Sequence, residues 1–409
     1  LGKKRFSEEE KDKLWSLGLG NKVLNIEDQQ YRLYPQKSLF SHVLGQTDED
    51  NIGISGIEKY YNKNLKNKNQ GNFSLVMSLD SNLQYLIREE LVKSQKIFNT
   101  IGSAALLMNV NNGEILSLVS LPDYDLNKRL SITDPSYTNK ITKGVYELGS
   151  VFKTFTIAAG LENEVINSNT IFRNLENSIT CDKHKISEHD KLPKDLSVEE
   201  ILVRSSNIGS VRIAQKVGLE NYKKFLNSLK LFKKINFDLE EVGSPLTFNW
   251  GKCKLATASF GRGIATTPLQ LARAYAILGN GGFEIKPSIL KSKIKLRKKG
   301  KQIVSTETSN LLNSMLRNVV SLNEGTANFA NVEGYEVGGK TGSSVKYTNN
   351  EKLNTFVALF PTSRPKYVLL IMLDEPKSAP HFTYDMPSSE KFPNGYKYKG
   401  ETRNTSGWN

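Results

Sequence analysis

A serine that lies three residues before a lysine is the pair in this sequence best suited to covalent chemistry. Ser150 and Lys153 stand in the stretch Tyr146-Glu-Leu-Gly-Ser-Val-Phe-Lys153, at the start of an apolar run. Positions three apart share one face of a helix, so the lysine amine can reach the serine hydroxyl. The first turn of a helix also presents unpaired backbone N–H groups that favour negative charge. The spacing predicts a serine nucleophile with Lys153 as its base.

Two later segments carry polar side chains of the kind that would complete such a site. Ser205 and Asn207 lie in the stretch Arg204-Ser-Ser-Asn-Ile-Gly209, and Lys340 lies in Gly338-Gly-Lys-Thr-Gly-Ser343. Each segment alone has a structural explanation, as a turn between helices or a strand that ends in a turn. The order Ser-x-x-Lys, Ser-x-Asn, Lys-Thr-Gly is, however, a known signature of serine enzymes that form acyl intermediates. The three motifs together predict one acyl-transfer site.

These residue types suit distinct steps of acyl transfer. Lys153 can act as a base only when its amine is neutral, and both burial and the proximity of Lys340 should lower its pKa from about 10.4. We expect Ser205 to relay a proton to the leaving amine. We expect the Asn207 amide to hold Lys153 and a substrate carbonyl. The catalytic residues are therefore predicted to be Ser150, Lys153, Ser205, Asn207 and Lys340.

The residues around Lys340 suit a substrate that carries a carboxylate. The Thr341 and Ser343 hydroxyls can bind that carboxylate together with Lys340, and Gly342 would leave room for substrate along the strand edge. The backbone N–H groups of Ser150 and Ser343 are predicted to form an oxyanion hole, which contributes roughly 3–4 kcal/mol per donor.

Beyond these motifs, the chain resembles a class B penicillin-binding protein, a peptidoglycan D,D-transpeptidase, almost from end to end. The segments that carry the resemblance are Arg32-Leu-Tyr-Pro35, His42-Val-Leu-Gly45, Gly53-Ile-Ser-Gly-Ile-Glu58, Ser78-Leu-Asp-Ser-Asn-Leu-Gln84, Gly113-Glu-Ile-Leu116, Leu121-Pro-Asp-Tyr-Asp125, Phe260-Gly-Arg-Gly-Ile264, Thr267-Pro-Leu-Gln270 and Glu324-Gly-Thr-Ala327. The second lysine of Lys340-Thr-Gly-Ser-Ser-Val-Lys346 is more similar to the cell-division branch than to the elongation branch. Leu148 stands where the family usually has proline, and Ser343-Ser344 replaces the commoner Thr-Ala.

The resemblance implies an α+β fold, in which a penicillin-binding and β-lactamase-like transpeptidase domain follows a small pedestal module. In that domain an antiparallel sheet is sandwiched by helices and joined to an all-helical part. We place the pedestal at residues 1–72 and the transpeptidase domain at 73–409, because the polar run 62–72 resembles a linker. We expect the pedestal to be truncated at its N-terminus and the catalytic domain to lack its final helix, which would leave an apolar strip on the sheet.

The resemblance also implies a function: cross-linking of peptidoglycan stem peptides through an acyl-enzyme on Ser150, in septal wall synthesis. The implied partners are stem peptides, β-lactams, a polytopic glycosyltransferase and other division proteins, with no cofactor. The implied place is the periplasmic face of the inner membrane, reached through an N-terminal helix that this chain does not contain. Two alternatives stay open. One is a catalytically retired scaffold of the division complex; the other is a β-lactamase, although no Glu-x-x-Leu-Asn segment follows Asn207.

Composition narrows the choice of partners. The 409 residues carry a net charge of +14, but the lysines are mixed with asparagine, as in 63–69, and no aromatic residues alternate with a basic stripe. We therefore expect no nucleic-acid partner. No apolar run reaches the roughly 18 residues of a membrane-spanning helix. Cys181 and Cys253 are expected to remain free thiols, and Cys181, His184 and His189 match no zinc template, so no metal site is predicted.

Hydrophobic periodicity and turn residues predict the elements that must position these motifs. Helices are predicted at 81–98, from a capping box at 197–200 up to Ser205, at 208–217 and at 268–278. Strands are predicted at 104–110, 114–120, 336–340, 355–360 and 367–373. The first two strands are apolar on both faces, so we expect them to be central and covered by helices. Residues 377–409 are expected to form a long loop near the mouth of the site.

Overall fold

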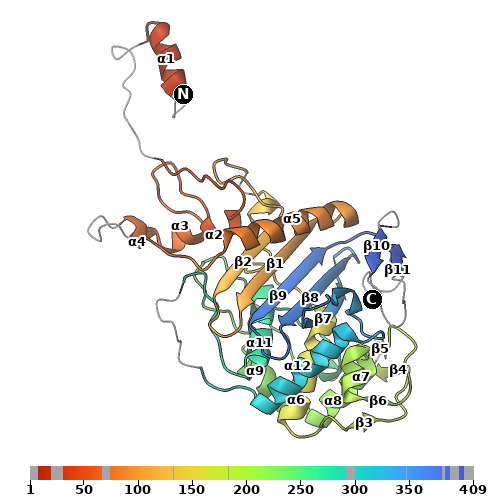
Figure 1. Cartoon of the computed structure of the whole chain (residues 1–409). Coiled ribbons are helices and arrows are strands. Elements are labelled where there is room, and N and C mark those ends of the chain that lie inside the picture. Colours follow the sequence, from red (N-terminus) through yellow and green to blue (C-terminus); the bar gives the residue numbers. More distant parts are fainter. Residues whose placement is uncertain are drawn as a thin grey trace.

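A five-stranded antiparallel sheet forms the centre of the molecule (Figure 1). The computed structural model describes residues 8–19, 31–66, 74–131, 133–182, 184–291, 300–346, 348–379, 383–386 and 396–399. In spatial order the strands are β2 (Ile115–Leu121), β1 (Gly102–Asn109), β9 (Tyr367–Asp374), β8 (Lys352–Phe360) and β7 (Gly338–Val345). Every neighbouring pair is antiparallel. The predicted α+β sandwich is confirmed.

Helices cover both faces of this sheet (Figure 1). Helix α5 (Ser81–Phe98) packs on β1 and β2, where Leu91 meets Ala105 and Val119. On the opposite face, α11 (Pro268–Gly279) packs against β8 and β9, and α12 (Thr306–Ser321) packs against β7. The largest apolar core of the molecule lies on this second side.

Local signals explain why several helix boundaries were predictable. Helix α5 begins where the Asp80 carboxylate accepts hydrogen bonds from two backbone N–H groups, and it ends at Asn99, whose backbone is left-handed. The capping boxes of Ser197 and of Thr267 start α7 (Val198–Val203) and α11. The first has the Glu200 side chain as its second member. These boundaries agree with those predicted.

One prediction about the sheet is wrong: β2 is an edge strand, not a central one. Its free edge is closed by a side chain, because Gln84 of α5 accepts a hydrogen bond from Leu118 N at 2.9 Å and donates to Leu118 O at 2.8 Å. Gln84 is almost completely buried. The Gln84 amide makes the backbone hydrogen bonds that a further strand would make at Leu118. The edge strand can therefore carry apolar side chains like those of a central strand.

The all-helical part lies on the α12 side of the sheet, where α6 (Lys153–Glu162) and α7 contact α12 (Figure 1). Its helices are α6, α7, α8 (Asn207–Val217), α9 (Leu219–Ser228) and α10 (Lys254–Ala258). Two short pairs of strands accompany them, β3 (Ile171–Phe172) with β6 (Leu196–Ser197) and β4 (Ser178–Cys181) with β5 (His184–Ser187). The described part of the chain before β7 also contains the 3-10 turns η2 (Pro135–Tyr137), η3 (Gly149–Phe152) and η4 (Asn328–Ala330).

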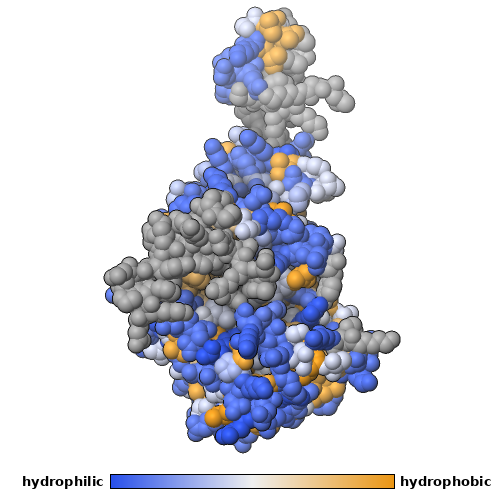
Figure 2. All heavy atoms as spheres, turned by 90° about the vertical axis from the view of Figure 1, so that its right-hand side faces the viewer, coloured by the Kyte–Doolittle hydropathy of each residue, from blue (hydrophilic) through white to orange (hydrophobic). Residues whose placement is uncertain are grey.

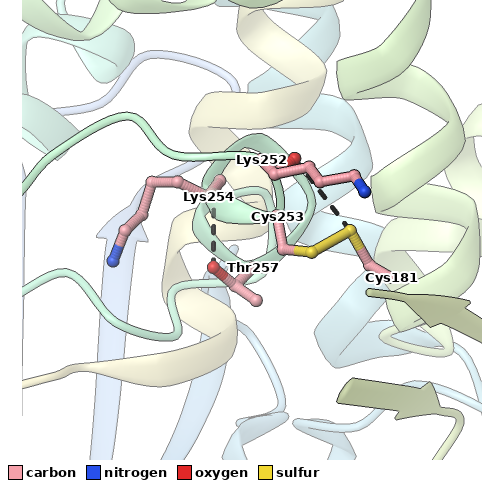
Figure 3. The surroundings of a disulfide bond; sticks show 5 residues. All are labelled: Cys181, Lys252, Cys253, Lys254 and Thr257. Carbon is pink, nitrogen blue, oxygen red and sulfur yellow. Dashed lines mark hydrogen bonds between the residues drawn. A yellow bond between two sulfur atoms is a disulfide. The ribbon is translucent and has the colours of Figure 1, made fainter. Parts of the chain in front are cut away.

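The expected free thiols are a second wrong prediction, because Cys181 and Cys253 form a disulfide (Figure 3). Cys181 ends β4, and Cys253 precedes α10. Their Cα atoms are 5.8 Å apart although 72 residues separate them in the chain. The bond therefore ties the β4–β5 hairpin to the helical part.

The N-terminal region contains α1 (Glu8–Ser16), α2 (Ser41–Leu44), α3 (Gly56–Tyr60) and α4 (Asn62–Lys66). Helix α4 occupies the first half of the run predicted as a linker, and residues 67–73 lie outside the described part. This region is joined to the sheet domain by polar contacts, including Gln46 Nε2 to Leu126 O at 2.8 Å and the ion pair of Lys59 with Glu240. The division near residue 72 remains a prediction. Among the described helices, none is long and apolar enough to cross a membrane.

Apolar side chains on the face of the sheet beside α5 are only partly covered, and the predicted loss of a final helix stays a prediction. Phe356 and Ile371 are only half-buried and line a hollow of about 260 Å³ together with Ser94 of α5. Toward the C-terminus, β10 (Thr383–Met386) pairs with β11 (Tyr396–Lys399), so the predicted long loop contains a hairpin. Most of the remaining residues of the predicted loop lie outside the described part of the chain.

Candidate active site

Ser150 lies in the 3-10 turn η3, immediately before α6, and is half-buried. The turn packs very closely against β7. The Gly149 backbone has φ of +63°, and a Cβ built there would be 2.3 Å from Ser343 O. Gly342 is equally restricted, because a Cβ there would be 2.3 Å from Leu148 O. The space beside Gly342 is therefore filled by the protein backbone rather than left free for substrate.

Lys153 is the first residue of α6 and has no solvent exposure. Its Nζ donates hydrogen bonds to the carbonyl of Ser205 and, at 3.0 Å, to the Ser205 hydroxyl. It forms no hydrogen bond with Ser150 in this structure, so the predicted serine–lysine contact is not made. Burial lowers the pKa of Lys153 to about 7, while the carboxylate of Glu188 acts in the opposite direction.

Ser205 lies in the turn between α7 and α8, with a left-handed backbone at φ of 57°. A residue other than glycine rarely adopts this left-handed backbone conformation, which costs on the order of 1 kcal/mol or more. The backbone is held there by the hydrogen bond from Ser205 N to Leu202 O and by the Lys153 amine on the Ser205 carbonyl. The conformation lets one residue present both its carbonyl and its hydroxyl to the same amine.

Lys340 reaches the same hydroxyl from β7. Its Nζ donates to Ser205 Oγ at 3.0 Å, to Thr326 Oγ1 at 3.3 Å and to the Thr341 carbonyl at 3.2 Å. Lys340 is fully buried. Burial, and then the nearby charge of Lys153, lower the pKa of Lys340 well below that of a free lysine.

Asn207 is the first residue of α8 and is 4% exposed. It was expected to hold Lys153, but its Nδ2 donates to Ser187 O at 2.9 Å instead. Its Oδ1 is buried and has no hydrogen-bond partner among the residues that the structure describes. A buried acceptor without a partner is costly, so this oxygen is suited to receive an N–H group from a ligand.

Of the three residues predicted to bind substrate, two present side chains to the cleft. Thr341 and Ser343 alternate along β7 with the buried Gly342, and Thr341 Oγ1 donates to Thr326 Oγ1 at 3.3 Å. The next residue, Ser344, donates to Glu147 O at 2.5 Å and so holds the chain that leads into η3.

These residues surround a narrow cleft of about 40 Å³. The cleft is lined by Ser150, Glu188, His189, Asp190, Leu192, Arg204, Ser205, Thr326, Thr341 and Ser343. The structure thus brings together Ser150, Ser205, Thr341 and Ser343 at the cleft, with Lys153 and Lys340 buried behind Ser205. Asn207 lies two residues beyond Ser205, at the start of α8.

Two of the cleft residues without a predicted role, Thr326 and Glu188, form hydrogen bonds with the predicted site. Thr326 belongs to the segment Glu324-Gly-Thr-Ala327, which carried a resemblance but no assigned role. Glu188 follows the β4–β5 hairpin and gave no signal in the sequence, because only folding brings it beside the Ser205–Asn207 segment. Cys181 is bound to Cys253 and does not offer a free thiolate to a metal.

A serine at the mouth of a cleft, with buried lysines behind it at the edge of an antiparallel sheet, defines a class of serine–lysine proteins. Family comparison is specific within that class. The family model described as the penicillin-binding protein transpeptidase domain matches residues 103–392, and that of the penicillin-binding protein dimerisation domain matches residues 4–97. The chain therefore belongs to the penicillin-binding protein family of transpeptidase-domain proteins.

Two relatives show how the similarity is distributed. The chain is 34% identical to the probable peptidoglycan D,D-transpeptidase FtsI of Caulobacter vibrioides, over 90% of this chain and 64% of the relative. It is 30% identical to the stage V sporulation protein D of Bacillus subtilis, over 93% of this chain and 65% of the relative. The chain thus spans just under two thirds of the length of these relatives.

Solved structures agree on the fold. The transpeptidase domain of penicillin-binding protein 3 from Burkholderia pseudomallei superposes with a TM-score of 0.68 and 28% identity, over 75% of this chain and 90% of that domain. Penicillin-binding protein 3 from Mycobacterium tuberculosis, solved with aztreonam, gives a TM-score of 0.74 over 85% of both chains, at 22% identity. At that identity the second likeness concerns the fold alone.

Proposed function

We propose that this chain is the catalytic portion of a peptidoglycan D,D-transpeptidase that cross-links stem peptides through an acyl-enzyme on Ser150. The observation that best supports the proposal is the meeting of Lys153 and Lys340 at the Ser205 hydroxyl, beside the cleft that Ser150 lines. Two buried amines on one hydroxyl provide a path for protons next to a serine nucleophile.

In the first step the neutral amine of Lys153 accepts the proton of Ser150 as Oγ attacks the penultimate D-Ala carbonyl. Because burial brings the pKa of Lys153 to about 7, a large fraction of the amine is neutral at physiological pH. The flexible lysine stem must swing from Ser205 to Ser150 for this step. The backbone N–H groups of Ser150 and Ser343 would stabilise the oxyanion, a role that accords with the close packing of η3 on β7.

In the second step the C–N bond to the terminal D-Ala breaks, and the leaving amine needs a proton. The Ser205 hydroxyl is placed to deliver one, because both lysines can replace it. The amine of a neighbouring stem peptide then attacks the acyl-enzyme by the reverse path, which forms the cross-link and frees Ser150.

Substrate recognition falls to the edge of β7 and the start of α8. The Thr341 and Ser343 hydroxyls, with Lys340, would bind the terminal carboxylate of the stem peptide. The unpaired Oδ1 of Asn207 would accept an N–H of the substrate backbone. A β-lactam carries the same carboxylate and carbonyl, so it would acylate the same serine.

The proposed setting is the periplasmic face of the inner membrane during septal wall synthesis, in company with a polytopic glycosyltransferase and other division proteins. The Cys181–Cys253 disulfide supports an oxidising compartment. The similarity to FtsI of C. vibrioides and the second lysine at Lys346 support the septal role. An N-terminal anchor outside this chain would hold it at the membrane.

Turnover of a peptide substrate tests this proposal. We expect the chain, given a stem pentapeptide ending in D-Ala-D-Ala, to release D-Ala and, with a second stem peptide as acceptor, to form a cross-linked dimer detectable by mass spectrometry. Ser150→Ala should release none. Ser228→Ala is a matched control, because that hydroxyl donates only within α9, to Phe225 O at 2.7 Å. A folded wild-type chain that neither releases D-Ala nor forms dimer would favour a retired scaffold.

A further inference from the structure

Glu188 is a carboxylate at the cleft for which the proposed mechanism has no role. It follows β5 directly, and its side chain accepts three hydrogen bonds from the first turn of α8 and its cap. The donors are Ser206 Oγ at 2.6 Å, Asn207 N at 2.7 Å and Ile208 N at 2.9 Å. No other carboxylate in the described part of the chain receives hydrogen bonds from these three groups.

The position of the Glu188 carboxylate at the start of α8 has a physical reason. Helix α8 has 11 residues, and the unpaired N–H groups of its first turn favour a negative charge. Ser206 already caps the helix through Gly209 N at 2.8 Å, so Glu188 satisfies N–H groups that the cap leaves over. Because two of its bonds fall on Asn207 and Ile208, the carboxylate fixes the backbone from which the Asn207 side chain projects.

The β4–β5 hairpin that supplies Glu188 is bound to α8 at one end and to the segment before α10 at the other. The carbonyl of the preceding residue, Ser187, accepts the bond from Asn207 Nδ2 at 2.9 Å, and Glu188 N donates to Asn177 O at 3.1 Å. At its other end the hairpin is tied to Cys253 through Cys181 (Figure 3). Glu188 therefore stands on a braced element rather than on a free loop.

Lys153 is linked to Glu188 through two adjacent residues, because its Nζ donates to Ser205 Oγ at 3.0 Å and the next residue, Ser206, donates to Glu188 at 2.6 Å. The charged groups around Lys153 are Glu188 after β5, Lys340 on β7 and His189 beside Glu188, and Arg262 acts in turn on His189. Burial, and then the charge of Lys153, lower the pKa of His189. Glu188 is the group that opposes the effect of burial on Lys153. Its charge thus keeps the amine from becoming neutral at still lower pH.

We propose that Glu188 is a positioning residue of this site, whose carboxylate holds the Asn207 backbone in place and supplies a negative charge beside the cleft that acts on the Lys153 amine. The proposal rests on the proposed function, because it assigns Lys153 and Asn207 to that site. It differs from a purely structural role, since a structural bond would not alter the titration of the lysine.

The test compares three variants of the full 409-residue chain. Glu188→Gln removes the charge and keeps the shape, whereas Glu188→Asp keeps the charge. Glu176→Gln is the matched control, because Glu176 also contacts α8, at Arg212, but is exposed and lies outside the cleft. The rate of acylation by a fluorescent penicillin is measured from about pH 5 to pH 9, the range that brackets the titration of Lys153.

In Glu188→Gln we expect the rising limb of the pH profile to move to lower pH by about one unit, because the negative charge that favours the ammonium form of Lys153 is lost. We expect the plateau rate to fall about tenfold as the Asn207 backbone loses a charged acceptor. Glu188→Asp should keep the position of the limb, and Glu176→Gln should match the wild type in both respects. An unchanged limb in folded Glu188→Gln would overturn the proposal.

A second readout does not depend on activity. In protein labelled with 13C at lysine Cε, the Lys153 signal is identified by its loss in Lys153→Met, and its titration is followed by NMR. The midpoint should be lower in Glu188→Gln than in the wild type, and equal midpoints would overturn the proposal even if no penicillin reacts. If the wild-type protein never reacts with penicillin, that result would count against the proposed transpeptidase activity but not against the proposed role of Glu188. If Glu188→Gln does not fold, Glu188→Asp decides, because it keeps the negative charge. The proposal is supported if the rising limb of its acylation profile stays at the wild-type pH, and it is overturned if that limb moves.

Discussion

Lys340 Nζ lies 3.0 Å from Ser205 Oγ, although 135 residues separate the two in the chain. Lys153 Nζ lies at the same distance from that oxygen. Burial lowers the pKa of both lysines, and the charge of Lys153 lowers that of Lys340 further. A proton can therefore pass between the two amines through the hydroxyl of Ser205.

The first prediction concerns stability as a function of pH. The pKa of Lys153 is about 7 in the folded protein and about 10.4 in an unfolded chain, so between these values the unfolded state binds a proton that the folded state does not. The free energy of unfolding should therefore rise with pH across this window, by up to about 1.4 kcal/mol per pH unit, and the gain is lost as pH falls toward 7. Lys340 contributes with the same sign.

Denaturant unfolding of the wild type and of Lys153→Met at several pH values between about 7 and 10 measures this contribution. The difference in unfolding free energy between the two proteins should grow in favour of the wild type as pH rises. Parallel curves would show that Lys153 is not titrated in this window.

The second prediction concerns Thr326, whose hydroxyl accepts hydrogen bonds from Lys340 and from Thr341, each at 3.3 Å. Thr326→Val removes the acceptor and keeps the shape of the side chain. We expect acylation by penicillin to slow about tenfold and the unfolding free energy to fall by roughly 1–2 kcal/mol, because two hydrogen bonds to this hydroxyl are lost. Thr326→Ser should retain most of the rate. Equal rates in the valine variant and the wild type would mean that Lys340 does not depend on this contact.

The third prediction concerns the disulfide, which closes a loop with a sequence separation of 72. Replacing both Cys181 and Cys253 by serine should lower the unfolding free energy by roughly 2–4 kcal/mol, because the unfolded chain gains freedom. Thermal unfolding with and without dithiothreitol provides the control. The reductant should destabilise the wild type and leave the double variant unchanged. A wild type that is insensitive to a reductant under denaturing conditions would contradict the pairing.

Much of the fold and the site could be predicted from the sequence because the signals are local. Helix α5 has its cap at Asp80 and its left-handed end at Asn99, and the three motifs occur in the order that the family requires. Each motif fixes its own turn or strand, and the shared fold brings them together.

The features that escaped prediction depend on contacts between distant segments. Gln84 closes the edge of β2, which the apolar pattern alone presented as a central strand. Cys181 and Cys253 approach each other only through the folding of the β4–β5 hairpin. Asn207 binds Ser187 rather than Lys153, and Glu188 reaches α8 from the same hairpin. None of these contacts has a signature at short range in the sequence.

Apolar side chains are scattered rather than gathered on the face that Figure 2 shows, where the described residues are mainly hydrophilic. Val332, Tyr335 and Val345 are examples of exposed apolar side chains near β7. Single exposed side chains of this kind are usual on a globular protein. They give no reason to place a further interface there.

Labelling with a fluorescent penicillin shows whether Ser150 forms an acyl-enzyme, and the measurement needs no peptide substrate. We expect an adduct on the peptide that contains Ser150, identified by mass spectrometry, that persists for hours and is absent from Ser150→Ala. Ser150 is half-buried, and its side chain forms no hydrogen bond with another residue in the described part of the chain. The unfolding free energy of the variant should therefore lie within about 0.5 kcal/mol of the wild-type value. An adduct lost within seconds would indicate a β-lactamase, and a folded wild-type chain that forms none would contradict the acyl-transfer site itself.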